Sequence, residues 1–212
     1  MWCILIVFIP HRLSFKQLEK EAPNFGVGGI GWQKWWLGVV RRTFTSAGCH
    51  ADSSSLDTIG HHLIRHFSGG NAYDLFDGST RLLEDIRGRG VVLGAISNSD
   101  ERLEGILLHL GVRHYFDFII TSYAAKVAKP DPRIFQQALS CAGNNITPSE
   151  ALHIGDDLQR DYLAARRCGW QSVLVSSQLH QVCQEAGVPV DGASMVTCLT
   201  DLHSLLDRYT TT

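Results

Sequence analysis

The sequence lacks the features that mark nucleic-acid-binding, zinc-binding and disulfide-rich proteins. It contains no run of Lys or Arg, and its 19 basic residues nearly balance its 21 acidic ones, which leaves a formal charge of −2. Without a basic patch, a chain has no electrostatic footprint for a nucleic-acid backbone. The six cysteines include no C-x-x-C pair, which argues against a zinc site and a small disulfide framework. We therefore expect no nucleic-acid partner, and reduced thiols as in a cytoplasmic protein.

Long apolar runs are also missing. The most apolar segment, residues 1–10, is shorter than the roughly 20 residues that cross a bilayer. As a signal peptide it lacks a basic start and a small-residue cleavage site. We expect no membrane attachment and an intracellular location. A β-branched apolar run such as residues 4–9 is typical of a fully buried strand.

Acidic residues are absent from residues 1–13, and the first one in the chain is Glu19. The region that follows, residues 14–78, has a helical pattern, with apolar residues at helical spacing over 33–47 and 56–67. His62 and His66 are four residues apart, a spacing that can bind a metal ion. No Glu accompanies them as in H-E-x-x-H, so a solvated helix face is favoured.

The remainder, residues 79–212, alternates short apolar strands with helices. Strands are predicted over 91–96, 116–121, 151–155 and 172–175, and helices over 79–89, 100–110, 132–142, 158–167 and 199–209. Apolar strands between helices indicate a parallel sheet that is covered on both faces. We predict an α/β protein, a three-layer sandwich with a mainly parallel, Rossmann-like sheet.

Polar groups follow three of these strands. Ser97 and Asn98 follow the strand over 91–96, and Lys129 precedes two prolines that give the next helix a rigid start. The strand over 151–155 ends in Asp156 and Asp157. Because the carboxyl ends of parallel strands share one edge of the sheet, where such folds bind ligands, these groups should converge there.

Each residue type at this edge suits phosphoryl chemistry. Clustered carboxylates at a strand end suit a hard cation such as Mg²⁺. A hydroxyl with a backbone N–H can hold a phosphate oxygen, and an ammonium group can neutralise a transferring phosphoryl group. Each residue also has an ordinary alternative: Asp156, Asp157 and Ser97 can cap helices, and Lys129 can be an exposed turn residue.

Three motifs together resemble the haloacid dehalogenase superfamily. They are Ile-Ser-Asn-Ser at 96–99, Lys-Pro-Asp-Pro at 129–132 and Gly-Asp-Asp at 155–157, the last followed by Asp161. The resemblance covers about residues 77–175 and implies a core over 79–212, a small helical cap over 14–78 and an atypical start over 1–13. It further implies Mg²⁺-dependent hydrolysis of a small phosphorylated molecule. The implied roles are phosphoryl binding by Ser97, Asn98 and Lys129, of which Ser97 and Lys129 are also catalytic, and metal binding by Asp156, supported by Asp157 and Asp161.

The start of the chain departs from this pattern. The superfamily opens with an apolar strand that ends in Asp-x-Asp, which supplies a nucleophile and a general acid, whereas residues 1–13 contain neither Asp nor Glu. Two function classes stay open: an impaired phosphatase, and a non-catalytic binding protein or truncated isoform of a full-length hydrolase. We expect little or no hydrolysis by the chain as written.

Overall fold

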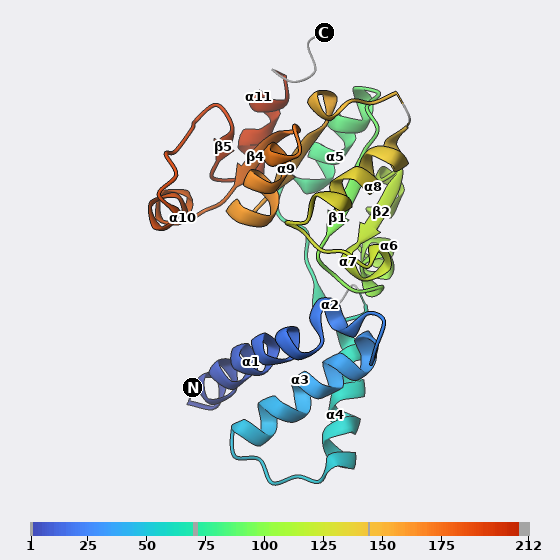
Figure 1. Cartoon of the computed structure of the whole chain (residues 1–212), viewed down its shortest axis with the longest axis vertical. Coiled ribbons are helices and arrows are strands. Elements are labelled where there is room, and N and C mark those ends of the chain that lie inside the picture. Colours follow the sequence, from blue (N-terminus) through green and yellow to red (C-terminus); the bar gives the residue numbers. More distant parts are fainter. Residues whose placement is uncertain (1, 70–71, 144, 208–212) are drawn as a thin grey trace. The chain divides into compact units, whose positions relative to one another are not determined.

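The computed structural model describes residues 2–69, 72–143 and 145–207, and the chain forms two compact units (Figure 1). The first, called the helical unit here, contains Met1–Asp74, Asn98–Leu110 and Thr121–Lys126. The second, called the sheet unit, contains Leu75–Ser97, Gly111–Ile120 and Val127–Thr212. No helix in the described ranges is long and apolar enough to cross a membrane.

The helical unit is built around one tryptophan. Its helices are α1 (Trp2–Glu21), α2 (Pro23–Gly26), α3 (Trp32–Ser46), α4 (Ser53–His66), α6 (Arg102–His109) and α7 (Ser122–Ala125). Trp35 is fully buried, its ring lies 5.0 Å from that of Phe15 and 5.3 Å from that of Phe25, and its Nε1 donates to Ala22 O. The helices predicted over 33–47 and 56–67 are confirmed as α3 and α4.

The predicted buried strand over residues 4–9 is wrong, because these residues belong to α1. A short apolar run can form either structure, and periodicity alone does not separate the two. A helix pairs its backbone groups within the segment, whereas a strand needs a neighbour that offers a matching edge. In this chain the run continues into residues 11–21, which are helical as well.

The sheet unit alternates strands and helices, as predicted. Its elements are α5 (Ser79–Gly88), β1 (Gly94–Ser97), η2 (Arg113–Tyr115), β2 (Phe118–Thr121), α8 (Pro132–Ala142), η3 (Pro148–Glu150), β3 (Leu152–Gly155), η4 (Leu158–Leu163), α9 (Ala164–Arg167), β4 (Gln171–Val175), α10 (Leu179–Ala186), β5 (Met195–Val196), η5 (Leu199–Asp201) and α11 (Leu202–Leu206). The closing helix predicted over 199–209 is η5 and α11, and residues 208–209 lie outside the described part of the chain. The predicted helix over 158–167 is a π-helical turn, η4, followed by α9.

The strands form two separate sheets among the described residues. One contains β1 and β2, and the other has the order β3-β4-β5. Both pairings in the second sheet are parallel, with Leu152 opposite Gln171 and Leu174 opposite Met195. The predicted α/β class with parallel strands is confirmed, but the predicted single sheet is interrupted between β1 and β3.

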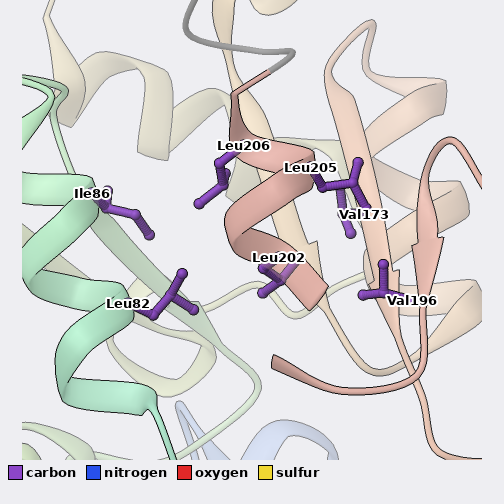
Figure 2. Packing of buried hydrophobic residues seen from close by; sticks show 7 residues of the cluster. All are labelled: Leu82, Ile86, Val173, Val196, Leu202, Leu205 and Leu206. Carbon is purple, nitrogen blue, oxygen red and sulfur yellow. The ribbon is translucent and has the colours of Figure 1, made fainter. Parts of the chain in front are cut away.

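Helices cover both faces of β4, which gives the three predicted layers. On one face, Val173 packs with side chains from α5, β5 and α11, and Figure 2 shows Leu82 and Ile86 directed toward Leu202 and Leu206. Successive side chains of a strand point to opposite faces. The next residue, Leu174, accordingly packs with a second cluster drawn from η4, α10 and β5. Burial of each large aliphatic side chain contributes about 1.5–3 kcal/mol.

Candidate active site

Lys129 lies where the ends of two strands of the sheet unit come together. Its Nζ donates to Ile96 O in β1 at 2.8 Å and forms an ion pair with Asp161 Oδ1 in η4 at 2.6 Å. The side chain is 10% exposed, so the ordinary alternative of an exposed turn lysine is excluded. Lys129 therefore links the carboxyl end of β1 to the segment that follows β3.

Asp161 is the buried anion beside Lys129, with only 6% of its side chain exposed. Besides the ion pair, Oδ1 lies 3.2 Å from His153 Nε2, and Oδ2 accepts from Asp157 N at 3.0 Å. Burial alone would raise the pKa of Asp161, but hydrogen bonds from His153 and Lys129 outweigh it and hold that pKa well below its ordinary value. Asp161 is therefore ionised over the physiological pH range.

Glycine at position 155 is required by the approach of Asp161. A Cβ atom on Gly155 would overlap with Cγ and Cβ of Asp161, well inside van der Waals contact. β3 ends at Gly155, and the chain then turns into η4, which carries Asp161 back over the strand end. The glycine of the Gly-Asp-Asp motif thus leaves the space that Asp161 occupies, and the motif also supplies two carboxylates.

Asp157 caps the start of η4, which is the helix-capping alternative given above for this residue. Its Oδ1 accepts from Gln159 N at 2.9 Å and from Arg160 N at 2.7 Å, and its Oδ2 accepts from Arg160 Nε at 2.8 Å. Partial burial would raise the pKa of Asp157, but hydrogen bonds from Arg160 outweigh it and lower that pKa. The carboxylate is therefore ionised and already holds several donors.

Asp156 and Ser97 are the predicted residues whose side chains are least engaged. Asp156 is exposed and directly follows β3, and its carboxylate makes no hydrogen bond or ion pair within the described residues. Ser97 is half-buried at the end of β1, next to Ile96, whose carbonyl accepts from Lys129. Asn98 follows in the chain but is grouped with the helical unit. The side chain of Lys129 thus contacts both the end of β1, where Ser97 lies, and Asp161 in η4.

The carboxylates offer a partial fit to a metal ion. Within the described residues, no group of three or more His, Cys, Asp or Glu side chains is arranged to hold one. Asp157 and Asp161 already accept several hydrogen bonds, which leaves Asp156 as the available carboxylate. Mg²⁺ usually keeps several waters and needs only one or two carboxylates. The residues present fit a water-rich Mg²⁺ at Asp156, and the wider predicted set of Asp156, Asp157 and Asp161 stays a prediction.

His153 is a site residue that the sequence reasoning did not single out. It is buried in β3, its Nε2 lies beside Asp161, and its ring lies 5.3 Å from that of Phe135 and 6.4 Å from that of Trp170. The available signal was its position two residues before Gly155 in an otherwise apolar strand. A polar residue at a buried strand position needs a hydrogen-bonding partner, and here that partner is Asp161.

Comparisons with known proteins show the family to which the chain belongs. A family model described as haloacid dehalogenase-like hydrolase matches residues 9–169. The chain is 41% identical over 166 residues to haloacid dehalogenase-like hydrolase domain-containing protein 3 of Bos taurus, a match that covers 78% of this chain and 65% of the relative. The chain thus spans about two thirds of the length of that relative.

Solved structures share the fold at low sequence identity. An HAD phosphatase from Thermococcus onnurineus has a TM-score of 0.57 at 18% identity, covering 95% of this chain and 90% of that chain. The putative HAD-hydrolase YfnB from Bacillus subtilis, solved with bound magnesium, has a TM-score of 0.67 at 16% identity, covering 93% and 82%. With the family match over most of its length and the 41% identity to the bovine protein, the chain belongs to the haloacid dehalogenase-like hydrolase family.

Proposed function

We propose that the sheet unit binds the phosphoryl group of a small phosphorylated molecule, and that the chain as given hydrolyses phosphate esters slowly or not at all. The observation that carries this proposal is the position of Lys129, whose ammonium is held between Ile96 O and Asp161 at the strand ends. A largely buried cation at a fixed position is worth more to a bound or developing negative charge than one in water.

Each side chain has a role in binding. Lys129 neutralises a phosphoryl oxygen, and Ser97 donates its hydroxyl to another oxygen of the same group. Asp161, whose pKa is lowered, stays ionised and holds the Lys129 side chain in place through the ion pair. Asn98 contributes to the same binding by resemblance to the family. Mg²⁺, when bound at Asp156, would supply further positive charge to the phosphoryl oxygens.

The missing step is nucleophilic attack. Phosphoryl transfer through a covalent intermediate needs a carboxylate aimed at phosphorus, and a second acid must protonate the leaving group. Residues 1–13 contain neither Asp nor Glu. Asp157 is occupied in capping η4, and Asp161 is occupied by Lys129 and His153. Binding without efficient turnover is therefore the function that we propose, and it is compatible with a non-catalytic binding role.

Two measurements on the purified chain test this proposal. The first is turnover of p-nitrophenyl phosphate with Mg²⁺, which should be slow or absent. Robust turnover that disappears in Asp156→Ala would show that a nucleophile exists and that the proposal of slow hydrolysis is wrong. Losing one member of a cooperating catalytic set commonly removes most of the rate, so we do not expect this chain to keep an intermediate rate of hydrolysis.

The second measurement is binding of inorganic phosphate, followed by calorimetry or by phosphorus NMR. Lys129→Met removes the charge at similar length and should abolish saturable binding. Lys126→Met is the matched control, because Lys126 lies three residues away and is exposed. Equal phosphate affinity in both variants would refute the assignment of Lys129 to the phosphoryl group. A folding check by far-UV circular dichroism accompanies both variants.

A further inference from the structure

His153 lies at a buried strand position that an apolar side chain could fill without any partner. It stands in β3 between Leu152 and Ile154, which pack against the hydrophobic cluster that includes α5 and α11. Because successive side chains of a strand point to opposite faces, the imidazole lies on the other face. There the rings of Phe135 and Trp170 stand nearly perpendicular to it, at 86° and 77°. This packing fixes the plane of the imidazole.

The direction of the hydrogen bond between His153 and Asp161 follows from the charge of Asp161. The side chains of the two residues are 9% and 6% exposed, and Nε2 lies 3.2 Å from Oδ1. An ionised carboxylate can only accept hydrogen bonds, so Nε2 of His153 is the donor. The proton is therefore on Nε2 whether the ring is neutral or charged, and the contact does not depend on titration of the imidazole.

The carboxylate of Asp161 is held by three donors from three segments of the sheet unit. Oδ1 takes the N–H of His153 from β3 and the ammonium of Lys129 from the turn before α8, and Oδ2 takes Asp157 N from the start of η4. His153 and Lys129 thus share one oxygen. Because a hydrogen bond stabilises the negative charge on that oxygen, less of the charge is left to neutralise Lys129.

We propose that His153 is a positioning residue for phosphoryl binding. Its Nε2–H holds the Asp161 carboxylate in the orientation that directs the ammonium of Lys129 toward the end of β1. This inference rests on the function proposed above, in which Lys129 binds the phosphoryl group. His153 acts through Asp161 and is not itself a ligand. Without it, Asp161 keeps two of its three donors, so the fold is retained while the position and charge of the ammonium change.

Two substitutions separate the hydrogen bond from the packing. His153→Phe keeps a ring against Phe135 and Trp170 but has no donor, whereas His153→Gln carries an amide N–H that can replace Nε2–H. Leu202→Ala is the control for general destabilisation, because Leu202 is 1% exposed and belongs to the cluster on the opposite face of the sheet. Far-UV circular dichroism checks the folding of each variant. His153→Leu replaces His153→Phe if that variant does not fold.

The first measurement is the ¹⁵N–¹H NMR signal of the Lys129 ammonium, recorded without phosphate. Lys129→Met identifies this signal by its loss. We expect the signal to shift or broaden in His153→Phe, to return to the parent position in His153→Gln and to stay in place in Leu202→Ala. An unchanged signal in His153→Phe would overturn the proposal. A signal that stays shifted in His153→Gln, or that shifts equally in Leu202→Ala, would overturn it as well.

The second measurement is the affinity for inorganic phosphate. We expect about tenfold weaker binding for His153→Phe, equivalent to roughly 1.4 kcal/mol, and an affinity close to that of the parent for His153→Gln. Equal affinity of the parent and His153→Phe would overturn the role of His153 and leave the assignment of Lys129 intact. Absence of phosphate binding in the parent would instead overturn the proposed function. The ammonium signal would then decide by itself whether His153 orients Lys129.

Discussion

Replacing Asp161 by asparagine tests whether the buried charge pair with Lys129 is the centre of the site. The substitution keeps the shape of the side chain and removes its negative charge. Asp161 and Lys129 have side chains that are 6% and 10% exposed, and their charged atoms are 2.6 Å apart. Asp161→Asn would leave the ammonium of Lys129 buried without a counter-ion, and the new amide nitrogen would face a donor. We expect a large loss of stability in the sheet unit.

The size of the loss follows from the burial. Removing one partner of a buried ion pair commonly destabilises a protein by about 3–5 kcal/mol, because the remaining charge stays uncompensated. That loss is a large share of the roughly 5–15 kcal/mol that stabilises a typical domain. Asp57→Asn is the matched control, since Asp57 pairs with Arg41 at the surface, where solvent screens the pair. The control should therefore change stability much less.

The effect of Asp161→Asn should also depend on pH in one direction. The pKa of Asp161 is lowered from its ordinary value of 3.8, so the folded state holds the proton less tightly than the unfolded chain. The stabilisation by the charge is therefore complete above the unfolded pKa and is lost as pH falls toward the folded pKa. The stability difference between the two proteins should be constant above about pH 5 and should shrink below the ordinary value.

Urea unfolding at a series of pH values measures this difference, with far-UV circular dichroism as the overall signal. Hydrogen exchange of β3 and β4 amides confirms that the loss falls in the sheet unit, where Asp161 lies. The reasoning is refuted if Asp161→Asn costs no more than Asp57→Asn. It is equally refuted if the difference between Asp161→Asn and the parent does not change between pH 7 and the acid transition.

Two further substitutions test the packing. Gly155→Ala forces a Cβ atom into Asp161, so it should weaken phosphate binding and lower the unfolding midpoint. Gly105→Ala is the control, because a Cβ atom at Gly105 meets open space. The control should leave phosphate binding and the unfolding midpoint unchanged or stabilise the chain by up to about 1 kcal/mol. Leu202→Ala removes a side chain that is 1% exposed in the core shown in Figure 2, and it should lower the free energy of unfolding in urea by about 2–5 kcal/mol. Leu108 is 61% exposed, so Leu108→Ala should lower that free energy little. Similar losses in the members of either pair would contradict the packing described.

Local patterns in the sequence predicted most of the sheet unit. Short apolar runs between helices indicated β1, β2, β3 and β4, and Pro132 indicated the start of α8. The structure adds that Asp131 caps the first turn of this helix. These elements are specified by neighbouring residues, through periodicity and capping, so one sequence is enough to find them. The strand β5 was missed because two residues carry too little periodicity to stand out.

The sequence predicts that the motif residues share one edge of the sheet, but it could not predict the state of each side chain. The order of the strand ends placed Ser97, Lys129 and Asp156 at one edge of the sheet. Only the folded chain shows that Asp161 is the buried partner of Lys129 and that Asp157 caps η4. Spacing along the chain does not determine which of several nearby carboxylates a cation contacts, because that depends on burial and on the turn at Gly155.

The tertiary structure decided the fate of residues 4–9 and of the sheet between β1 and β3. The sequence by itself determined that residues 4–9 are apolar and that residues 1–13 carry no acid, and both facts hold in any conformation. Whether an apolar run becomes a strand depends on a partner edge that is distant in the chain, whereas a helix closes its hydrogen bonds locally. Here the run is helical, and β1 and β3 remain in separate sheets with a cavity between them.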